Sequence, residues 1–265
     1  MAAGMNLATY RFDDGIGPAR VADGRIADLR TLAPTMIDLI ERGWDDAADV
    51  AATLPLDLER LLAPVPIPRA FLGVGLNYRD HAAETGRALP VEPRIFAKLA
   101  SAVASPFSEI PRPAPTFDYE GELGVVIGRG GSVAGYVVVN DLTIRALAVP
   151  DTLLLAKSAP GSAPFGPWIT TADAIADPHA LAIRTIVNGE LRQSSTTAQM
   201  HHRIDTILDY LADHVRLLPG DIVTTGSPSG AGLGFDPPRW LEPGDVVRVE
   251  IDGLGHIENR IAEGS

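Results

Sequence analysis

Two glutamates, two residues apart, lead into a segment rich in valine and isoleucine. Glu120 and Glu122 precede Leu123–Ile127, and residues two apart on a β-strand project from the same face. Adjacent carboxylates repel each other, so without a cation at least one of the two should hold a proton. Their oxygens are also the hard ligands that Mg²⁺, Mn²⁺ and Ca²⁺ prefer. The spacing therefore indicates a divalent-cation site.

Asp141 is the candidate third ligand of this site. It follows a second strand-like segment, Gly135–Val139, and a hairpin through Gly130-Gly131 would place that strand beside the first. Asp141 would then lie close to the two glutamates. The spacing alone leaves another interpretation open, a solvated strand face with Asp141 capping a turn, because Glu-x-Glu is a common string.

His81 and Glu84 form a second candidate cluster. They are three residues apart, so on a helix their side chains share a face and can touch. A carboxylate that accepts one imidazole proton orients the ring and raises its basicity, as a general base requires. The alternative is a surface helix with incidental charges. The apolar segment Phe71–Leu76 leads directly into this helix, which favours the functional interpretation because sites are often placed at strand ends.

Two further features could face a site. Lys157 follows an apolar run and is either a solvent-exposed charge, the more common case, or a partly buried cation. The Gly- and Ser-rich turn 224–230, which contains Thr225 and Gly226, could hold a carboxylate on its backbone N–H groups. It lacks the lysine and the spacing of a phosphate-binding loop. The other five histidines lack metal-ligand spacing, and no Gly-x-Ser-x-Gly motif suggests a serine hydrolase.

The elements that must position these residues divide the chain into two parts. Residues 5–32 alternate like strands, with tight turns at Asp13–Gly15 and Asp23-Gly24, and residues 36–62 have helical periodicity. Prolines at 64, 66 and 68 then form a stiff, extended connector. We therefore expect a small N-terminal module over residues 1–63 and a catalytic domain over residues 64–265.

The larger part is predicted to contain many short strands and few helices. Helices are expected near Tyr78–Thr85 and His202–Asp213, and strands at Phe71–Leu76, Leu123–Ile127, Gly135–Val139, Leu181–Val187, Asp221–Thr225 and Val246–Ile251. Strands dominate and helices are scattered, so the predicted class is α+β, mainly β.

Composition excludes several kinds of protein. The net charge of −12 provides no basic field for nucleic acid or an anionic membrane. The absence of cysteine excludes disulfides, thiolate ligands and a cysteine nucleophile. The sequence starts without the basic and apolar segments of a signal peptide, and no apolar run reaches the roughly 18 residues of a membrane span. A cytoplasmic protein with no membrane span is expected.

Taken together, these segments resemble the fumarylacetoacetate hydrolase family, in particular its bacterial branch of acylpyruvate hydrolases and 2-hydroxyhepta-2,4-diene-1,7-dioate isomerases. Their order is preserved over roughly residues 65–261. The matching stretches are Gly73–Tyr78 with His81 and Glu84, Ile95–Lys98, Asp118–Leu123, Gly135-Tyr136, Asn140–Thr143, Lys157-Ser158, Phe165–Trp168, Val187–Glu190, Pro219–Asp221 and Thr225–Gly230.

The resemblance implies a fold, a metal centre and a set of catalytic residues. The fold would be a mixed β-sandwich roll. Mg²⁺ or Mn²⁺, with Ca²⁺ able to occupy the site in crystals, would be held by Glu120, Glu122 and Asp141. His81 and Glu84 would activate water, and Lys157 would stabilise developing negative charge. The resemblance also implies four substrate-binding positions, namely Tyr78, Lys98, Thr225 and Gly226.

Members of this family act on 2-oxo or 1,3-dicarbonyl acids, usually as homodimers, and some serve aromatic catabolism. The expected function is therefore cleavage of a C–C bond in an acylpyruvate- or fumarylacetoacetate-type acid, through an enolate on the divalent metal. Alternatives are a decarboxylase or isomerase of a 2-oxo or 2-hydroxydienoate diacid, and a degenerate, non-catalytic member. Three departures from the family pattern, Val74, Ala146 and Pro160, favour a substrate smaller than fumarylacetoacetate.

Overall fold

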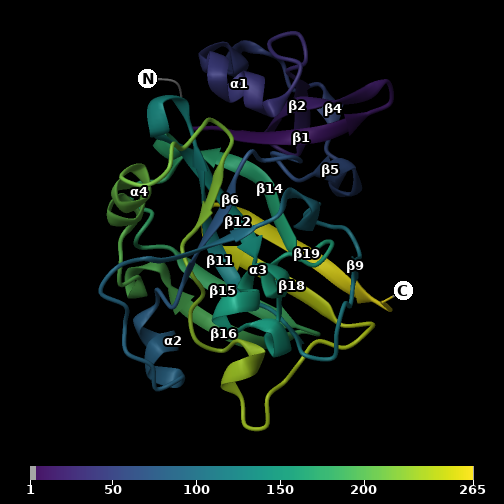
Figure 1. Ribbon diagram of the computed structural model, residues 1–265. Coiled ribbons are helices and arrows are strands. Elements are labelled where there is room, and N and C mark those ends of the chain that lie inside the picture. The colour runs from purple at the N-terminus through teal and green to yellow at the C-terminus, as the bar shows by residue number, and fades with distance from the viewer. Residues whose placement is uncertain (1–3, 265) are drawn as a thin grey trace.

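Two β-sheets packed face to face form the core of the protein in the computed structural model, which describes residues 4–264 (Figure 1). The larger sheet is 12-stranded. Its strands, in spatial order, are β4 (Leu54–Pro55), β3 (Arg25–Asp28), β2 (Gly15–Ala22), β1 (Asn6–Phe12), β14 (Ala163–Thr171), β12 (Val133–Asn140), β11 (Gly121–Ile127), β17 (Ile222–Thr224), β6 (Phe71–Gly75) and β7 (Arg94–Lys98), with β5 (Leu61–Leu62) paired to β1 and β8 (Val103–Ala104) paired to β14.

The second sheet is smaller and covers one face of the first. Its five strands are β16 (Glu190–Thr196), β15 (Ala182–Val187), β18 (Val246–Ile251), β19 (Gly255–Ala262) and β9 (Ile110–Pro111). A separate two-stranded ladder pairs β10 (Phe117–Asp118) with β13 (Thr143–Ile144). The helices are α1 (Met36–Arg42), α2 (Arg79–Glu84), α3 (Leu153–Lys157) and α4 (Ile204–Ala212). The predicted α+β, mainly β class is confirmed.

The alternation of side chains along β11 explains how both faces of the large sheet are buried. Leu123, Val125 and Ile127 point into the core shared with the smaller sheet, whereas Val126 points into the core beneath α1. Strands buried on both faces have sequences that are apolar almost without interruption, and β11 and the neighbouring β12 are strands of this kind. The central hairpin is thus held rigidly from two sides.

The N-terminal strands continue the large sheet. β1 pairs with β14 through Asn6 opposite Thr170, and Figure 1 shows β1, β2 and α1 together at one end of the molecule. The turns predicted at residues 13–15 and 23–24 connect β1 to β2 and β2 to β3, as expected. Whether residues 1–63 form a domain of their own stays a prediction.

The helical periodicity over residues 36–62 gave a wrong expectation beyond residue 42. A capping box between Thr35 and Asp38 starts α1, but Gly43, with φ of 93°, ends it after seven residues. Short 3₁₀ turns and the strands β4 and β5 follow. Among the described residues, no helix is long and apolar enough to cross a membrane.

Candidate metal centre and active site

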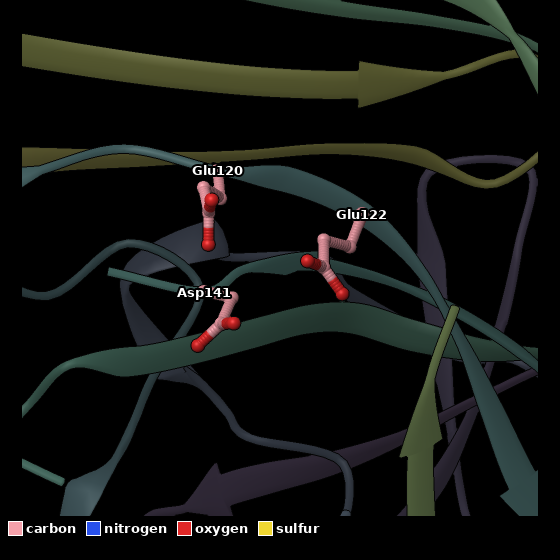
Figure 2. Close-up of side chains that lie close together, drawn as sticks. All are labelled: Glu120, Glu122 and Asp141. Carbon is pink, nitrogen blue, oxygen red and sulfur yellow. The ribbon is translucent and has the colours of Figure 1, made fainter. Parts of the chain in front are cut away.

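The hairpin of β11 and β12 brings the three predicted ligands together. Gly121 pairs with Asn140 in this hairpin, and the Asp141 N–H donates to the Glu120 carbonyl at 2.8 Å. Each of Glu120, Glu122 and Asp141 offers a carboxylate oxygen, and these oxygens lie within 4.8 Å of one another. Figure 2 shows the three carboxylates turned toward a common space. All three are buried, so the solvated-face interpretation is wrong.

Two lysines neutralise part of this negative charge. The Lys157 Nζ lies 2.5 Å from Glu120 Oε2 and 2.5 Å from Asp141 Oδ2. The Lys98 Nζ donates to the other oxygen of Asp141 at 2.6 Å. Lys157 is therefore a buried cation and not a solvent-exposed charge, and it is the last residue of helix α3.

Arg145 is a third cation at the site, held between two acids. Its guanidinium group donates to Glu120 Oε1 at 2.8 Å and to Asp118 Oδ2 at 2.7 Å. Burial opposes ionisation of Glu120, but Arg145 and Lys157 outweigh it and hold the pKa of Glu120 below its ordinary value. Glu120 is thus a carboxylate fixed in its charged form.

Glu122 has a different environment. Burial, together with the charges of Asp141 and Glu120, raises its pKa well above the ordinary value. It forms no ion pair within residues 4–264, and its Oε2 accepts a 3.1 Å hydrogen bond from the Gly226 N–H. This charged network as a whole has four buried carboxylates, Asp118, Glu120, Glu122 and Asp141, against three cations, the buried Lys98 and Lys157 and the partly buried Arg145.

This arrangement fits a divalent cation. The donors are carboxylate oxygens, which suit Mg²⁺ and Mn²⁺, and each of the three carboxylates keeps at least one oxygen with a lone pair that no protein donor uses. One buried negative charge also remains without a protein cation when all four acids are ionised. A dication near Glu122 would offset it and relieve the repulsion among the three ligands.

The predicted pair of His81 and Glu84 is also formed. His81 Nδ1 lies 3.1 Å from Glu84 Oε2 on helix α2. The other oxygen of Glu84 accepts a 2.9 Å hydrogen bond from the Gly230 N–H, so the carboxylate is fixed from both sides. A carboxylate at Nδ1 leaves Nε2 of the imidazole as the free basic nitrogen. This geometry is that of an oriented general base.

His81 of the pair and Glu120 and Glu122 of the triad line one cavity of about 320 Å³, and Glu84 and Asp141 lie behind them. Its charged and polar lining residues are His81, Arg87, Arg94, Glu120, Glu122, Arg145, Lys157 and Ser227. Apolar side chains supply much of the rest, among them Val74, Leu76, Ile95, Phe96, Val149 and Leu153. A small acid with an apolar middle section would fit such a cavity.

The four predicted substrate-binding residues lie behind this cavity rather than on its surface. Tyr78 is fully buried in the core, and Lys98 is bound to Asp141. The Thr225 hydroxyl donates to the Leu123 carbonyl at 3.0 Å, and Gly226 supports Glu122. None of the four is among the residues that line the cavity. Their role as substrate contacts stays a prediction.

Two residues of the charged network received no role from the sequence, namely Asp118 and Arg145. Asp118 is two residues before Glu120, the same strand spacing that singled out the triad. Arg145 directly follows β13, and β13 pairs with β10 through Ile144 opposite Phe117. The spacing of Asp118 was therefore a usable signal, whereas the contact of Arg145 depends on a pairing between distant segments.

Known proteins share both the sequence and this fold. Residues 70–262 match the fumarylacetoacetate (FAA) hydrolase C-terminal domain family. The mitochondrial oxaloacetate tautomerase FAHD2B of Bos taurus is 38% identical over 264 residues, which cover 90% of this chain and 84% of that protein.

Two solved structures extend the comparison. Fumarylacetoacetate hydrolase from Exiguobacterium antarcticum has a TM-score of 0.84 and 34% identity, covering 98% of this chain and 99% of that one. Maleylpyruvate hydrolase from Sphingobium sp. SYK-6, solved with manganese(II) and pyruvate, has a TM-score of 0.80 and 30% identity, covering 98% and 100%. The chain belongs to the fumarylacetoacetate hydrolase family.

Proposed function

We propose that the protein is a metal-dependent enzyme that moves a proton on the carbon beside the carbonyl of a 2-oxo acid, interconverting its keto and enol forms. The observation that carries this proposal is the contact of His81 with Glu84, with His81 lining the same cavity as Glu120 and Glu122. One oriented base beside a cation site is sufficient for a tautomerase. The 38% identity with an oxaloacetate tautomerase supports this choice.

Glu120, Glu122 and Asp141 would hold Mg²⁺ or Mn²⁺, which when bound supplies Lewis-acid polarisation of the 2-oxo group. His81 accepts the proton at Nε2, while Glu84 holds the ring and stabilises the imidazolium. Lys157 lies beside Glu120 and Asp141, and the acids next to it overcome the effect of burial and raise its pKa. It therefore stays charged and can offset negative charge that develops on the substrate oxygen.

C–C bond hydrolysis is the second candidate. It is favoured by the maleylpyruvate hydrolase of the same fold, which was solved with manganese(II) and pyruvate. In this reaction His81 would draw its proton from water, and the hydroxide would attack the distal carbonyl of a 1,3-dicarbonyl acid. The two reactions use the same residues and differ in whether water reaches the carbonyl.

Product analysis separates the candidates. The protein is incubated with Mg²⁺ or Mn²⁺ and either oxaloacetate, followed by the loss of its enol absorbance, or an acylpyruvate, followed by chromatography of the products. Faster enol–keto exchange of oxaloacetate, with the acylpyruvate left intact, supports the tautomerase. Release of pyruvate from the acylpyruvate supports the hydrolase. Neither activity with either metal would overturn both. The two metals tested in parallel also decide which one is preferred.

The predicted homodimer and the cytoplasmic location belong to this proposal as well. Family membership supports a small organic acid as the binding partner. Light scattering of the purified protein measures its mass directly, and a mass near 28.0 kDa would contradict the dimer. Cell fractionation tests the location.

A further inference from the structure

Two arginines line the cavity but form no hydrogen bond or ion pair with its charged floor, which is formed by Glu120, Glu122, Arg145 and Lys157. Arg87 and Arg94 are exposed, and both contribute to the cavity surface. Neither guanidinium group has a hydrogen-bond or ion-pair partner within residues 4–264. The floor cations Lys157 and Arg145, in contrast, are bound to Glu120 and its neighbours. In a protein with a net charge of −12, two uncommitted cations at one cavity are available to an incoming anion.

The backbone of each arginine is fixed close to the base. Arg87 follows Gly86, which has φ of 63°, and its N–H donates to the Ala82 carbonyl at 3.0 Å. This is the hydrogen bond that closes the C-terminal end of a helix, and the helix is α2, which carries His81. Arg87 therefore occupies a defined position relative to the base.

Arg94 is fixed on the strand beside this helix. It is the first residue of β7 and pairs with Gly75 at the end of β6, immediately before the turn into α2. The segment between the two arginines is held at the Pro90 carbonyl, which lies 3.1 Å from His201 Nε2 and 3.0 Å from His202 Nε2. Both arginines thus start from anchored backbone, and only their flexible side chains need to order around a ligand.

We propose that Arg87 and Arg94 are the residues that bind a second carboxylate at the far end of a 2-oxo acid substrate. This inference rests on the proposed function, which assigns the 2-oxo end to the triad. The floor cations are engaged by protein carboxylates, so among the described residues that line the cavity Arg87 and Arg94 are the cations free to bind a second anionic group. Apolar lining residues such as Ile95, Val149 and Leu153 suit the carbon chain that joins the two ends.

The test compares acids that differ only in the distal carboxylate. Binding to the Mg²⁺-loaded protein is measured by calorimetry for 2-oxoglutarate against 2-oxopentanoate, and for 2-oxoadipate against 2-oxohexanoate. The wild type should bind at least one diacid about tenfold more tightly than its monoacid at low ionic strength. Added salt should reduce this preference, because exposed charges are screened.

Variants then assign the preference to the arginines. R87Q and R94Q should each reduce it, and R87Q/R94Q should abolish it while leaving the affinity for the monoacids within about twofold, since the 2-oxo end is untouched. Arg216 is also exposed and lines a different cavity, so R216Q makes the same change in net charge and should keep the preference.

The outcomes separate the two proposals. A diacid preference that survives in R87Q/R94Q, or a wild type without any preference, overturns the arginine subsite and leaves the proposed function standing. If neither member of either pair binds the Mg²⁺-loaded wild type, the 2-oxo acid site itself is wrong and the subsite falls with it.

Discussion

The backbone N–H of Gly226 donates a 3.1 Å hydrogen bond to Oε2 of Glu122. Glu122 is the ligand of the triad that forms no ion pair in the described part of the chain. It accepts a hydrogen bond from a peptide group, whereas Glu120 and Asp141 contact the ammonium or guanidinium groups of lysine and arginine. A dipole offsets less charge than a cation does. Glu122 should therefore be the ligand most affected by the arrival of a metal ion.

Metal binding is expected to stabilise the fold. A ligand at 100 times its dissociation constant adds about 2.7 kcal/mol to the free energy of unfolding, which for a protein of this size raises the Tm by roughly 5–10 °C. Thermal unfolding with Mg²⁺, with Mn²⁺ and with EDTA measures the shift. E122Q should lose most of it while its metal-free form is as stable as the wild type or more so, because a repelled buried carboxylate is gone. A full Mg²⁺ shift in E122Q would show that Glu122 is not a ligand.

The turn at Gly226 comes close to Glu122, and this approach requires glycine at position 226. Gly226 has φ of 93°, and a Cβ there would lie 2.9 Å from the Cβ of Asn77 and 3.1 Å from the carbonyl of Val74. G226A should therefore lower the free energy of unfolding by about 2–4 kcal/mol, combining backbone strain with overpacking. Gly24 is the matched control, since its φ is 69° but a Cβ there meets no atom within 4 Å. G24A should cost only about 1 kcal/mol in urea unfolding, and equal losses in the two variants would contradict the steric argument.

The base and its orienting acid should be separable from the metal site. H81A is expected to lower kcat by roughly 10²–10⁴-fold, whichever of the two candidate reactions is measured, while calorimetry finds Mg²⁺ affinity close to that of the wild type. E84Q should also lose activity, because a glutamine that accepts from the Gly230 N–H turns its NH₂ group toward His81 Nδ1 and favours the tautomer that is protonated at Nε2. Wild-type activity in H81A would mean that another group moves the proton.

Much of the site could be predicted because its geometry is local. The contact of His81 with Glu84 follows from helical spacing, and Asp141 meets Glu120 through one hairpin. The cations that bind the triad could not be predicted in the same way. Lys98 reaches Asp141 from β7, which lies at the edge of the large sheet, and this contact depends on the order of strands that are distant in sequence.

The helix α3 and the strand β14 are two of the elements that the sequence patterns did not predict, for related physical reasons. The five-residue helix α3 consists of the apolar run Leu153–Ala156 and Lys157, and at this length periodicity does not distinguish a strand from a helix. β14 was missed because Pro164, Gly166 and Pro167 interrupt its sequence and because it is buried on both faces, so it has no alternating pattern. Its place at the centre of the large sheet is determined by pairing with β1 and β12.

The loop between the two cavity arginines should make stability depend on pH through His202. This residue is 8% exposed, and burial lowers its pKa below the ordinary value of 6.5. The unfolded chain therefore binds a proton more readily than the folded one, and stability that is present above pH 6.5 is lost as the pH falls below that value. In H202Q the amide can still donate to the Pro90 carbonyl, but it does not titrate. Urea unfolding of both proteins between about pH 7.5 and 5.5 should show the free energy of the wild type falling more steeply than that of H202Q. Parallel curves would mean that the His202 ring protonates equally well in the folded and unfolded states.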